Sequence, residues 1–439
     1  MTFNISMLAG AGWQFFDNSG VILSGGLLYT YAAGTTTPQT AYTSSSGSTA
    51  HTNPIVLDSA GRVPSGGEIW LIDGVSYKFV LKTSVGVTIG TYDNIFNINY
   101  FGTNPIGIKS INGGQIAGLR NRIINGYMQV DQRNSGASKT ITGGIGYAGS
   151  AYTVDRWAAF SVGSTGATFT AQRTGSAPYS LSLTVTAINF GTTLGIYQRI
   201  ESVNCTDLVN QSITISATIS CDSAQTVTWI AYYPNVKDTW TGPGVSSSQS
   251  TNATQIATGT WSATTTPTRF NATFTNASSL NGLQIVIQRS INANSQTLVV
   301  TDAQLELGST VTTFEQRPYG LELMLCQRYY YRTVPNFSGA YYGGGRTSST
   351  SQGNINLRFP VRMRTVPSAI ETTGTASDYQ IGYVASSTAL TAVPVYVSFV
   401  TTQDVASMNF TTAAVLTAGQ PVDLQAGTTS AYLGWSAEL

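Results

Sequence analysis

The chain has 439 residues, which is too long for one hydrophobic core, and its length predicts about three domains. Charged residues make up only 9% of it, against about 25% in an ordinary soluble domain, and the net charge is +1. No cluster of Lys and Arg could neutralise a run of phosphates, so we expect no nucleic-acid partner. The chain is 41% apolar, is rich in Thr, Val, Ile and Tyr and lacks blocks of helix-forming residues, so its composition predicts an almost wholly β protein with an uncharged polar surface.

The start of the chain, MTFNISMLAG, has no basic segment, and the sequence contains no apolar run of about 18 residues. We therefore expect synthesis in a cytoplasm without export and no insertion into a membrane. Cys205, Cys221 and Cys326 are too few and too scattered for a disulfide framework or a zinc site, so buried reduced thiols are expected. His51 is the only histidine, which argues against a catalytic triad built on one.

Residues 1–100 alternate strand-like runs with turn residues, which predicts a small N-terminal β domain of meander type. The run GEIWLIDGVSYKFVLKTSVGVTIGTYDNI predicts two hairpins, the first of which turns at Asp73-Gly74. In YKFVLK, alternation places Tyr77 and Phe79 on the same face of a strand.

Residues 101–124 are rich in Gly and Asn and are predicted to form a linker or short stem, without the heptads of a coiled coil. Residues 125–318 carry many short strand-like runs at regular spacing, which predicts a jelly roll or β-sandwich. In SITISATIS, alternation directs one set of side chains to the core: Ile213, Ile215, Ala217 and Ile219. Trp157 and Trp229 are also expected in the core of this domain.

Residues 319–439 are predicted to form a C-terminal β domain, from runs such as NINLRFPVRMR, PVYVSFV and MNFTTAAVL. A short helix is expected near 319–331, where Pro318 suits the first turn and LELMLCQRYYY supplies good helix formers. Apolar residues lie on most sides of this helix, which predicts that it is buried between neighbours. The predicted fold class is therefore all-β, with consecutive sandwich or jelly-roll domains and one short helix.

Several long, ordered motifs carry a family resemblance. The stretch GGLLYTYAAGTTTPQTAYTSSSGSTAHTNPIVLDSAGRV, followed by EIWLIDGVSYKFVLKTSVGVTI, resembles the tail-proximal N-terminal domain of bacteriophage tail fibre proteins. The segments NRIINGYMQVDQR, YTVDRW, VVTDAQLELGS and TFEQRPYGLELMLCQRYY resemble the jelly-roll module of the same proteins. The resemblance spans the N-terminal and middle domains and stops before the strands of the C-terminal one.

The resemblance implies a homotrimeric fibre located in the virion tail and made in the cytoplasm of the bacterial host. Residues 1–100 would dock to a phage tail, baseplate or adaptor protein. The distal domains would bind a host surface glycan such as lipopolysaccharide or capsule, with no cofactor. In that trimer the helix near 319–331 would couple the sandwich rigidly to a C-terminal tip; the alternative is an ordinary intradomain helix.

Two other functions stay open. One is a structural virion adaptor or head-decoration fibre that makes no receptor contact. The other is a polysaccharide depolymerase, which needs two carboxylates at a defined separation. Acidic residues are sparse here, and the long repeats of a parallel β-helix are absent from the sequence, so we expect no enzymatic activity.

Sugars are bound by aromatic faces together with planar polar groups, and two stretches offer both. In the sandwich, WIAYYPNVKDTWTGPG contains four candidates: Tyr233, Lys237, Asp238 and Trp240. In the C-terminal domain, NFSGAYYGGGRTSSTSQGN is predicted to be a long loop and is slightly preferred, with three candidates: Tyr341, Tyr342 and Arg346. In the alternative interpretation, the sandwich aromatics pack its edge and the tyrosine pair lines the threefold axis of a trimer.

A metal site is only weakly indicated. Asp302, in VVTDAQLEL, resembles an acid on the last strand of calcium-bearing carbohydrate-binding jelly rolls, but Gln129 stands where a further acid would help. We therefore predict no metal. The run Gly343–Gly345 lacks the Lys-Ser/Thr of a nucleotide loop and is predicted to be a flexible turn.

Overall fold

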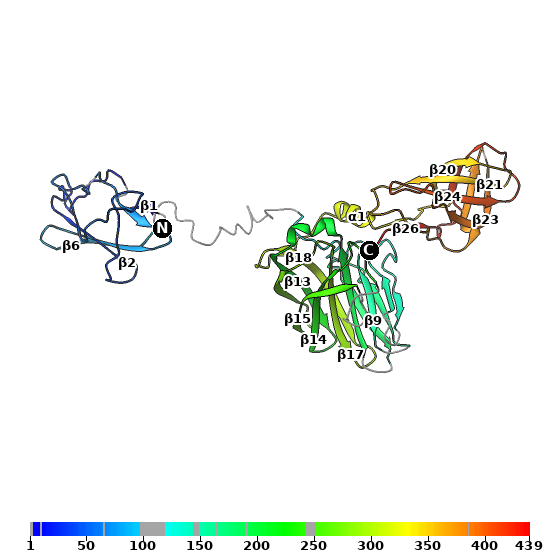
Figure 1. Ribbon diagram of the computed structural model, residues 1–439, viewed down its shortest axis with the longest axis horizontal. Coiled ribbons are helices and arrows are strands. Elements are labelled where there is room, and N and C mark those ends of the chain that lie inside the picture. The colour runs from blue at the N-terminus through cyan, green and yellow to red at the C-terminus, as the bar shows by residue number, and fades with distance from the viewer. Residues whose placement is uncertain are drawn as a thin grey trace. The chain divides into compact units, whose positions relative to one another are not determined.

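The computed structural model describes residues 3–8, 11–64, 66–96, 119–143, 149–163, 166–188, 192–241, 252–384 and 386–439. The described residues form β-strands and one short α-helix, which confirms the predicted all-β fold class (Figure 1). It divides into two compact units, Met1–Ile116 and Ala117–Leu439. Within the predicted linker, residues 101–118 lie outside the described residues. No helix in the described part of the chain is long and apolar enough to cross a membrane.

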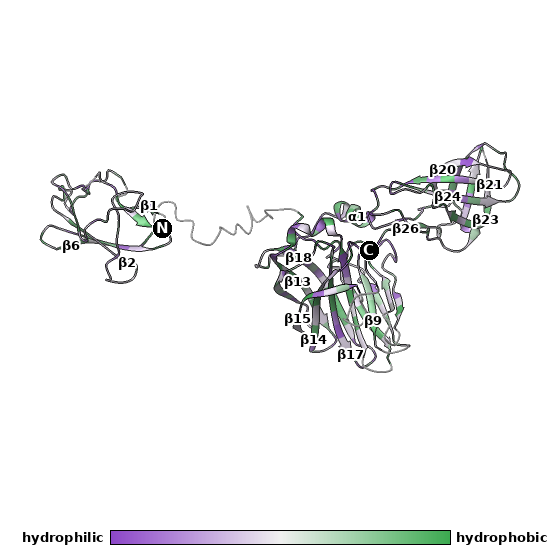
Figure 2. Ribbon diagram, viewed as in Figure 1, coloured by the Kyte–Doolittle hydropathy of each residue, from purple (hydrophilic) through white to green (hydrophobic). Residues whose placement is uncertain are grey.

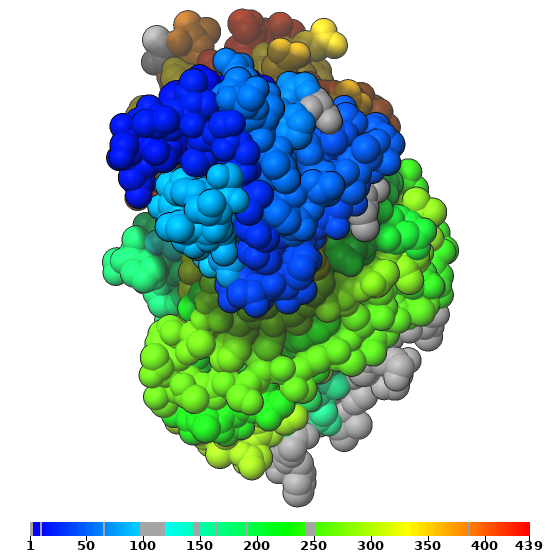
Figure 3. Space-filling model, turned by 90° about the vertical axis from the view of Figure 1, so that its left-hand side faces the viewer, coloured from blue at the N-terminus to red at the C-terminus, as the bar shows by residue number. Residues whose placement is uncertain are grey.

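The N-terminal unit, blue in Figure 3, contains a two-stranded and a four-stranded sheet. Its strands are β1 (Phe3–Ile5), β2 (Leu27–Ala32), β3 (Ile55–Val56), β4 (Trp70–Ile72), β5 (Tyr77–Lys82) and β6 (Thr88–Ile95). Tyr77 and Phe79 are fully buried in its core, as predicted. The hairpin predicted at Asp73-Gly74 is wrong: the turn exists, but β4 pairs with β1 whereas β5 pairs with β2 and β6. A turn signal determines where the chain reverses direction. Which strands then pair is determined by packing of the core.

The middle domain is a sandwich of two six-stranded antiparallel sheets. One sheet has the order β16-β13-β18-β11-β10-β7 and the other β15-β14-β17-β12-β9-β8. The strands are β7 (Lys139–Thr142), β8 (Gly149–Tyr152), β9 (Ala158–Val162), β10 (Thr168–Arg173), β11 (Leu181–Ala187), β12 (Thr192–Ile200), β13 (Gln211–Cys221), β14 (Gln225–Pro234), β15 (Ala253–Ala263), β16 (Thr268–Asn276), β17 (Leu283–Ile291) and β18 (Thr297–Leu307). Between β12 and β13 run two short 3-10 helices, Ser202–Asn204 and Thr206–Leu208.

One continuous apolar core fills the space between these sheets, and polar and apolar residues alternate along the strands (Figure 2). The four residues predicted to point inward from β13 are all fully buried, and Trp157 and Trp229 are buried with them. All three cysteines are free and buried, as predicted. The core also extends past the predicted domain boundary, because Ile123, in the stretch predicted as linker, is fully buried within it.

The C-terminal domain closes into a six-stranded barrel of order β20-β21-β24-β23-β22-β25. Its strands are β20 (Tyr341–Thr347), β21 (Gln352–Arg358), β22 (Tyr379–Tyr383), β23 (Ser386–Tyr396), β24 (Val405–Thr412) and β25 (Pro421–Ala426), with a 3-10 helix at Ala376–Asp378 before β22. A separate two-stranded ladder, β19 (Tyr330–Thr333) with β26 (Leu433–Ser436), carries the chain into and out of the barrel. Trp435 of β26 is fully buried in the barrel core.

The predicted helix is present as α1 (Tyr319–Gln327), directly after Pro318. It ends before the tyrosine run, since Tyr330 already belongs to β19. Within one chain the helix is not buried on most sides: its buried residues are Glu322 and Cys326, whereas Met324 is 50% exposed. A charged residue turns inward here because the main-chain N–H of Asn125 and the Arg317 guanidinium both donate to the Glu322 carboxylate.

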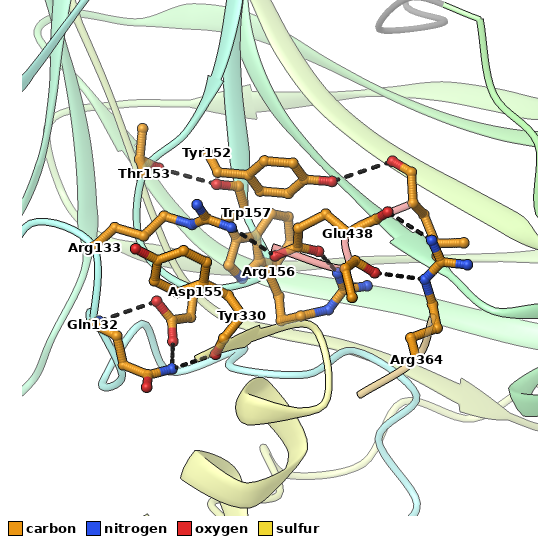
Figure 4. Close-up of polar contacts among 12 residues, drawn as sticks. Gln132, Arg133, Tyr152, Thr153, Asp155, Arg156, Trp157, Tyr330, Arg364 and Glu438 are labelled. Atoms are coloured by element: carbon orange, nitrogen blue, oxygen red, sulfur yellow. Dashed lines mark hydrogen bonds and ion pairs between the residues drawn. The ribbon is translucent and has the colours of Figure 1, made fainter. Parts of the chain in front are cut away.

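Three segments that are far apart in the sequence meet at the end of the sandwich (Figure 4). Gln132 donates from its side chain to the Asp155 carboxylate and to the main-chain oxygen of Tyr330, at 2.9 Å for the latter. Trp157 donates from its indole nitrogen to the main-chain oxygen of Asn125 at 3.0 Å. Three of the motifs that carry the family resemblance, NRIINGYMQVDQR, YTVDRW and TFEQRPYGLELMLCQRYY, thus assemble into one buried polar junction.

The last residues of the chain are held in this junction by charge. Arg156, which is 1% exposed, pairs with Glu438, whose side chain is 5% exposed. Arg133 lies 3.4 Å from the same carboxylate. The Arg156 guanidinium also stacks 3.5 Å from the centre of the Tyr329 ring and donates to the main-chain oxygen of Arg199. A buried carboxylate with two guanidinium partners is stable only while all of them are present.

The residues after α1 contact both domains. Arg328 donates two hydrogen bonds of 3.1 Å to Glu201 of the sandwich, and the Tyr329 hydroxyl donates a third of 2.8 Å. The main-chain N–H of Arg364, from the C-terminal domain, donates to the Arg328 oxygen at 2.7 Å. Within one chain, these are the contacts that a rigid coupling between the sandwich and the C-terminal domain requires. The place of the helix in a trimer stays a prediction.

Asp155 makes the junction sensitive to pH. Burial raises the pKa of its carboxyl above the usual value of 3.8 to about 6, although hydrogen bonds from Gln132 and the charge of Arg133 oppose the change. The folded state therefore holds a proton that the unfolded chain releases, so this stabilisation is complete below about pH 4 and is lost as the pH rises through about 6. We expect the free energy of unfolding of residues 117–439 to fall by about 3 kcal/mol across that window. Urea denaturation at four pH values measures this decrease. If the free energy of unfolding of Asp155→Asn depended on pH to the same extent, the assignment of the effect to Asp155 would be contradicted.

Candidate functional site

The preferred candidate stretch in the C-terminal domain is a strand, so the prediction of a long flexible loop is wrong. Tyr341–Thr347 forms β20, which pairs with β21 and β25 in the barrel. A side chain on Gly345 would collide with the main-chain oxygen of Asn354, and one on Gly343 with that of Asn356. The glycine run is thus required by close strand packing, where sequence alone indicated a turn.

The two neighbouring tyrosines have different environments. Tyr341 is 70% exposed, whereas Tyr342 packs against the barrel core with its ring centre 6.4 Å from that of Tyr379. Burial raises the pKa of the Tyr342 hydroxyl, as expected for a ring that packs inward. Tyr341 is therefore the tyrosine that can contact a ligand.

A bulge in β20 places two of the predicted binding residues on the same outer surface. Tyr341 and Arg346 are five positions apart, and in a regular strand an odd separation puts side chains on opposite faces. The ladder between β20 and β25 shifts register between Tyr341 and Gly343, which resets the alternation. As a result both Tyr341 and Arg346 are exposed.

A pocket on the outside of the barrel, the first pocket, has a volume of about 540 Å³. Tyr341 of β20 and Tyr383 of β22 line it together with Asp423 and Gln425 of β25. Gly382, which also lines the pocket, lies so close to the Gln425 amide that a Cβ atom there would collide with it. That amide oxygen accepts a hydrogen bond of 3.1 Å from Gln380, which fixes its orientation.

The chemistry of this first pocket suits a saccharide. The exposed Tyr341 offers a ring face for the C–H surface of a sugar, and a carboxylate and an amide offer hydrogen bonds to its hydroxyls. The hydroxyls of Ser386 and Ser387 add to the polar lining. A single carboxylate, Asp423, is present in the lining, whereas glycoside hydrolysis uses a pair.

The second pocket, of about 270 Å³, contains Arg346. Its other lining side chains come from the β20–β21 turn, β21 and β24: Ser348, Gln352, Asn354, Asn409, Phe410 and Thr411. The two pockets thus contain Tyr341 and Arg346 separately, one in each.

The structure separates the four candidates of the sandwich stretch. Both oxygens of the Asp238 carboxylate accept hydrogen bonds from Ser202, at 2.7 and 2.8 Å, so Asp238 anchors its own loop. Trp240 packs against a buried cluster that includes Tyr232, whereas Tyr233 is the next residue on β14 and points to the other face. Lys237 is exposed. These residues do not form one platform.

Asp302 is placed in a bulge and engaged by neighbours. Thr218 donates to its carboxylate at 3.3 Å, and Arg269 donates to its main-chain oxygen at 2.9 Å. Burial raises the pKa of the Asp302 carboxyl. Gln129 donates to the main-chain oxygen of Arg317. Within the described ranges, no three His, Cys, Asp or Glu side chains gather as a metal site.

Sequence reasoning missed Tyr383, Asp423 and Gln425, which share the first pocket with Tyr341. They come from strands that reach Tyr341 only through the register of the closed barrel, in which Gln425 lies opposite Tyr341 and Asp423 opposite Gly382. No local signal in the sequence encodes that register. Their residue types are also ordinary for an exposed strand.

No protein-family model and no curated protein matches the chain. Among solved structures, the chain is similar to TmCBM61 in complex with β-1,4-galactotriose, with 8% identity over 43% of this chain and 99% of that one and a TM-score of 0.24. It is similar to a putative sugar binding protein from Bacteroides thetaiotaomicron, with 13% identity over 43% of this chain and 100% of that one and a TM-score of 0.26. It is also similar to the enzymatically active domain of tailspike protein 4 of bacteriophage CBA120, with 10% identity over 45% of this chain and 22% of that one and a TM-score of 0.26. At these TM-scores the likenesses carry no argument about function, which depends on the residues.

Proposed function

We propose that the chain is a homotrimeric phage tail fibre that binds a host surface glycan, such as lipopolysaccharide or capsule, through the outside of its C-terminal barrel. The observation that carries the proposal is the 540 Å³ pocket, in which an exposed Tyr341 lies with Tyr383, Asp423 and Gln425. The resemblance of the N-terminal and middle segments to tail fibres supports the proposal that the chain is a phage tail fibre. Binding without catalysis and without a cofactor is part of the proposal.

The N-terminal unit offers a surface for the virion partner. A loop closed by Asp17, whose carboxylate accepts main-chain hydrogen bonds from Ser19 and Val21, carries exposed apolar side chains. Phe16, Val21 and Ile22 are 46%, 61% and 46% exposed. Exposed apolar groups at one loop are typical of protein contacts, so this loop is the part of residues 1–100 that we propose to dock to a tail, baseplate or adaptor protein.

Three copies of the barrel would present the pocket three times, so weak binding at each pocket becomes strong attachment. On α1, the 50% exposed Met324 and the 56% exposed Tyr319 are apolar side chains that a neighbouring subunit would cover. The proposed location is the virion tail, after synthesis in the bacterial cytoplasm.

The experiment measures binding of the full chain to immobilised lipopolysaccharides and capsular polysaccharides from a panel of bacterial strains, with the mass of the same preparation read by sedimentation. We expect a trimer that binds at least one polysaccharide. Tyr341→Ala should weaken single-pocket binding about threefold to tenfold, because a stacking face is lost. Phe399→Ala is the matched control, since Phe399 is 87% exposed and lies outside both pockets.

Other outcomes would favour the alternatives. A trimer that binds no polysaccharide and is retained by tail components would indicate a structural adaptor. Release of reducing ends from a bound polysaccharide would indicate a depolymerase. A monomer at micromolar concentration would contradict the proposal.

A further inference from the structure

Arg346 has no side-chain partner among the residues that the structure describes, unlike the arginines of the sandwich junction. Arg317, Arg156 and Arg328 each lie within hydrogen-bond distance of a carboxylate. Arg346, in contrast, is exposed and makes no side-chain hydrogen bond or ion pair with any residue that the structure describes. No acidic side chain lines its pocket. The guanidinium is therefore available to an external anion.

The strand register surrounds Arg346 with uncharged polar groups. Asn354 of β21 lies opposite Arg346, and Asn409 of β24 lies opposite Asn354, so three polar side chains form a row across the barrel. On the other side, Arg346 lies opposite Pro421, whereas Asp423 lies opposite Gly344. The nearest acid on β25 is thus two residues further along and belongs to the first pocket.

The two asparagines beside Arg346 differ in the groups that they leave free, because Asn354 uses its amide N–H groups within the barrel. The Asn354 amide nitrogen donates to Ser407 at 2.7 Å and contacts the Asn409 side-chain oxygen at 3.4 Å. With its oxygen engaged, Asn409 has its amide N–H groups left, and these make no hydrogen bond within the described ranges. The Gln352 side chain adds a further amide to the lining. A guanidinium with the free amide N–H groups of Asn409 beside it matches the geometry of a carboxylate or a phosphate.

We infer that the Arg346 pocket binds the anionic group of an acidic saccharide, either a uronate carboxylate or a sugar phosphate. This inference deepens the proposed function and rests on it, because it assigns the sign of charge on the glycan. Tyr341 and Arg346 are five residues apart on β20, a span of about 16 Å along the strand. An oligosaccharide can therefore stack one ring in the first pocket and place its charged group in the second.

The test uses the full chain and three oligosaccharides of matched length: oligogalacturonate, its carboxyl-reduced neutral form, and a phosphorylated oligomannose without carboxylates. We expect at least one acidic probe to bind tenfold or more tighter than the neutral one. Arg346→Gln should weaken that acidic probe about tenfold to a hundredfold and leave the neutral probe unchanged, since a charge-assisted pair is removed. Comparison of the two acidic probes identifies whether carboxylate or phosphate is preferred.

Two variants sharpen the result. Arg358→Gln is the matched control, because Arg358 is exposed on β21 and lies outside the pocket; its effect should stay within twofold. Arg346→Lys retains the charge without the planar fork and should recover only part of the affinity. Equal loss in Arg346→Gln and Arg358→Gln would indicate diffuse attraction and overturn the inference.

Failure of this inference is distinguishable from failure of the proposed function. Equal binding of acidic and neutral probes, with Tyr341→Ala still weakening both, would overturn the anion pocket and retain glycan binding. Absence of binding by every probe, together with no binding to the bacterial polysaccharides, would overturn both.

Discussion

Replacing Arg156 with methionine lowers the free energy of unfolding of residues 117–439 by about 3–5 kcal/mol, because Glu438 loses its buried partner. The same substitution removes a stacking contact with Tyr329 and a hydrogen bond to the main-chain oxygen of Arg199. Arg133 still lies 3.4 Å from Glu438, but it cannot replace either of those contacts. Chemical denaturation, followed by tryptophan fluorescence, measures the loss.

The control for Arg156→Met is Arg362→Met. Arg362 pairs with Asp404 at 3.8 Å, and both side chains are more than half exposed, at 65% and 52%. Exposed pairs contribute about 0–1 kcal/mol, so this variant should unfold almost as the parent does. A double substitution of Arg156 and Glu438 by apolar residues should recover part of the stability, because no unpaired charge is left buried. Equal denaturation curves for Arg156→Met and the parent would contradict the assigned role of the pair.

Gly345→Ala costs about 3 kcal/mol of barrel stability, because the added methyl group would overlap the main-chain oxygen of Asn354 on β21. The strand cannot move away easily, since β20 is bonded on both sides in a closed barrel. Near-UV circular dichroism during thermal unfolding reports on the barrel core, which contains Trp435 and Tyr379.

Gly344→Ala is the adjacent control. A Cβ atom on Gly344 would lie 3.3 Å from the Asp423 carboxylate, at the end of an exposed side chain that can move. We expect a change below about 0.5 kcal/mol for this variant. Equal stabilities of the two alanine variants would show that strand packing does not explain the glycine run.

The sequence predicts those elements whose structure depends on residues that are adjacent in the chain. Alternation in β13 identified all four inward side chains, since a strand buried on one face must alternate. Composition identified the all-β class, and the run after Pro318 identified α1. The same local reasoning failed at Asp73-Gly74 and at Gly343–Gly345, where the partner strand determines the structure.

The candidate site was predicted in part for the same reason. Tyr341 and Arg346 were identified from residue type, and the structure shows them on one surface, each in a pocket. They share this surface because β20 contains a bulge, and no residue in the run predicts that bulge. The pairing of Asn354 with Arg346 and of Asp423 with Gly382 depends on barrel register, a property of the whole domain.

The ladder of β19 and β26 has an evolutionary consequence. The chain enters and leaves the barrel through two adjacent antiparallel strands, so both connections lie side by side. The ion pairs that Arg328 and Glu438 make with the sandwich fall outside the stretch between them. Recombination that replaced 334–432 with a different fold would keep these ion pairs, although it would remove the contacts that Arg364 and Glu371 make with the junction. Under the proposed function, one such event would exchange the glycan-binding barrel and keep the sandwich.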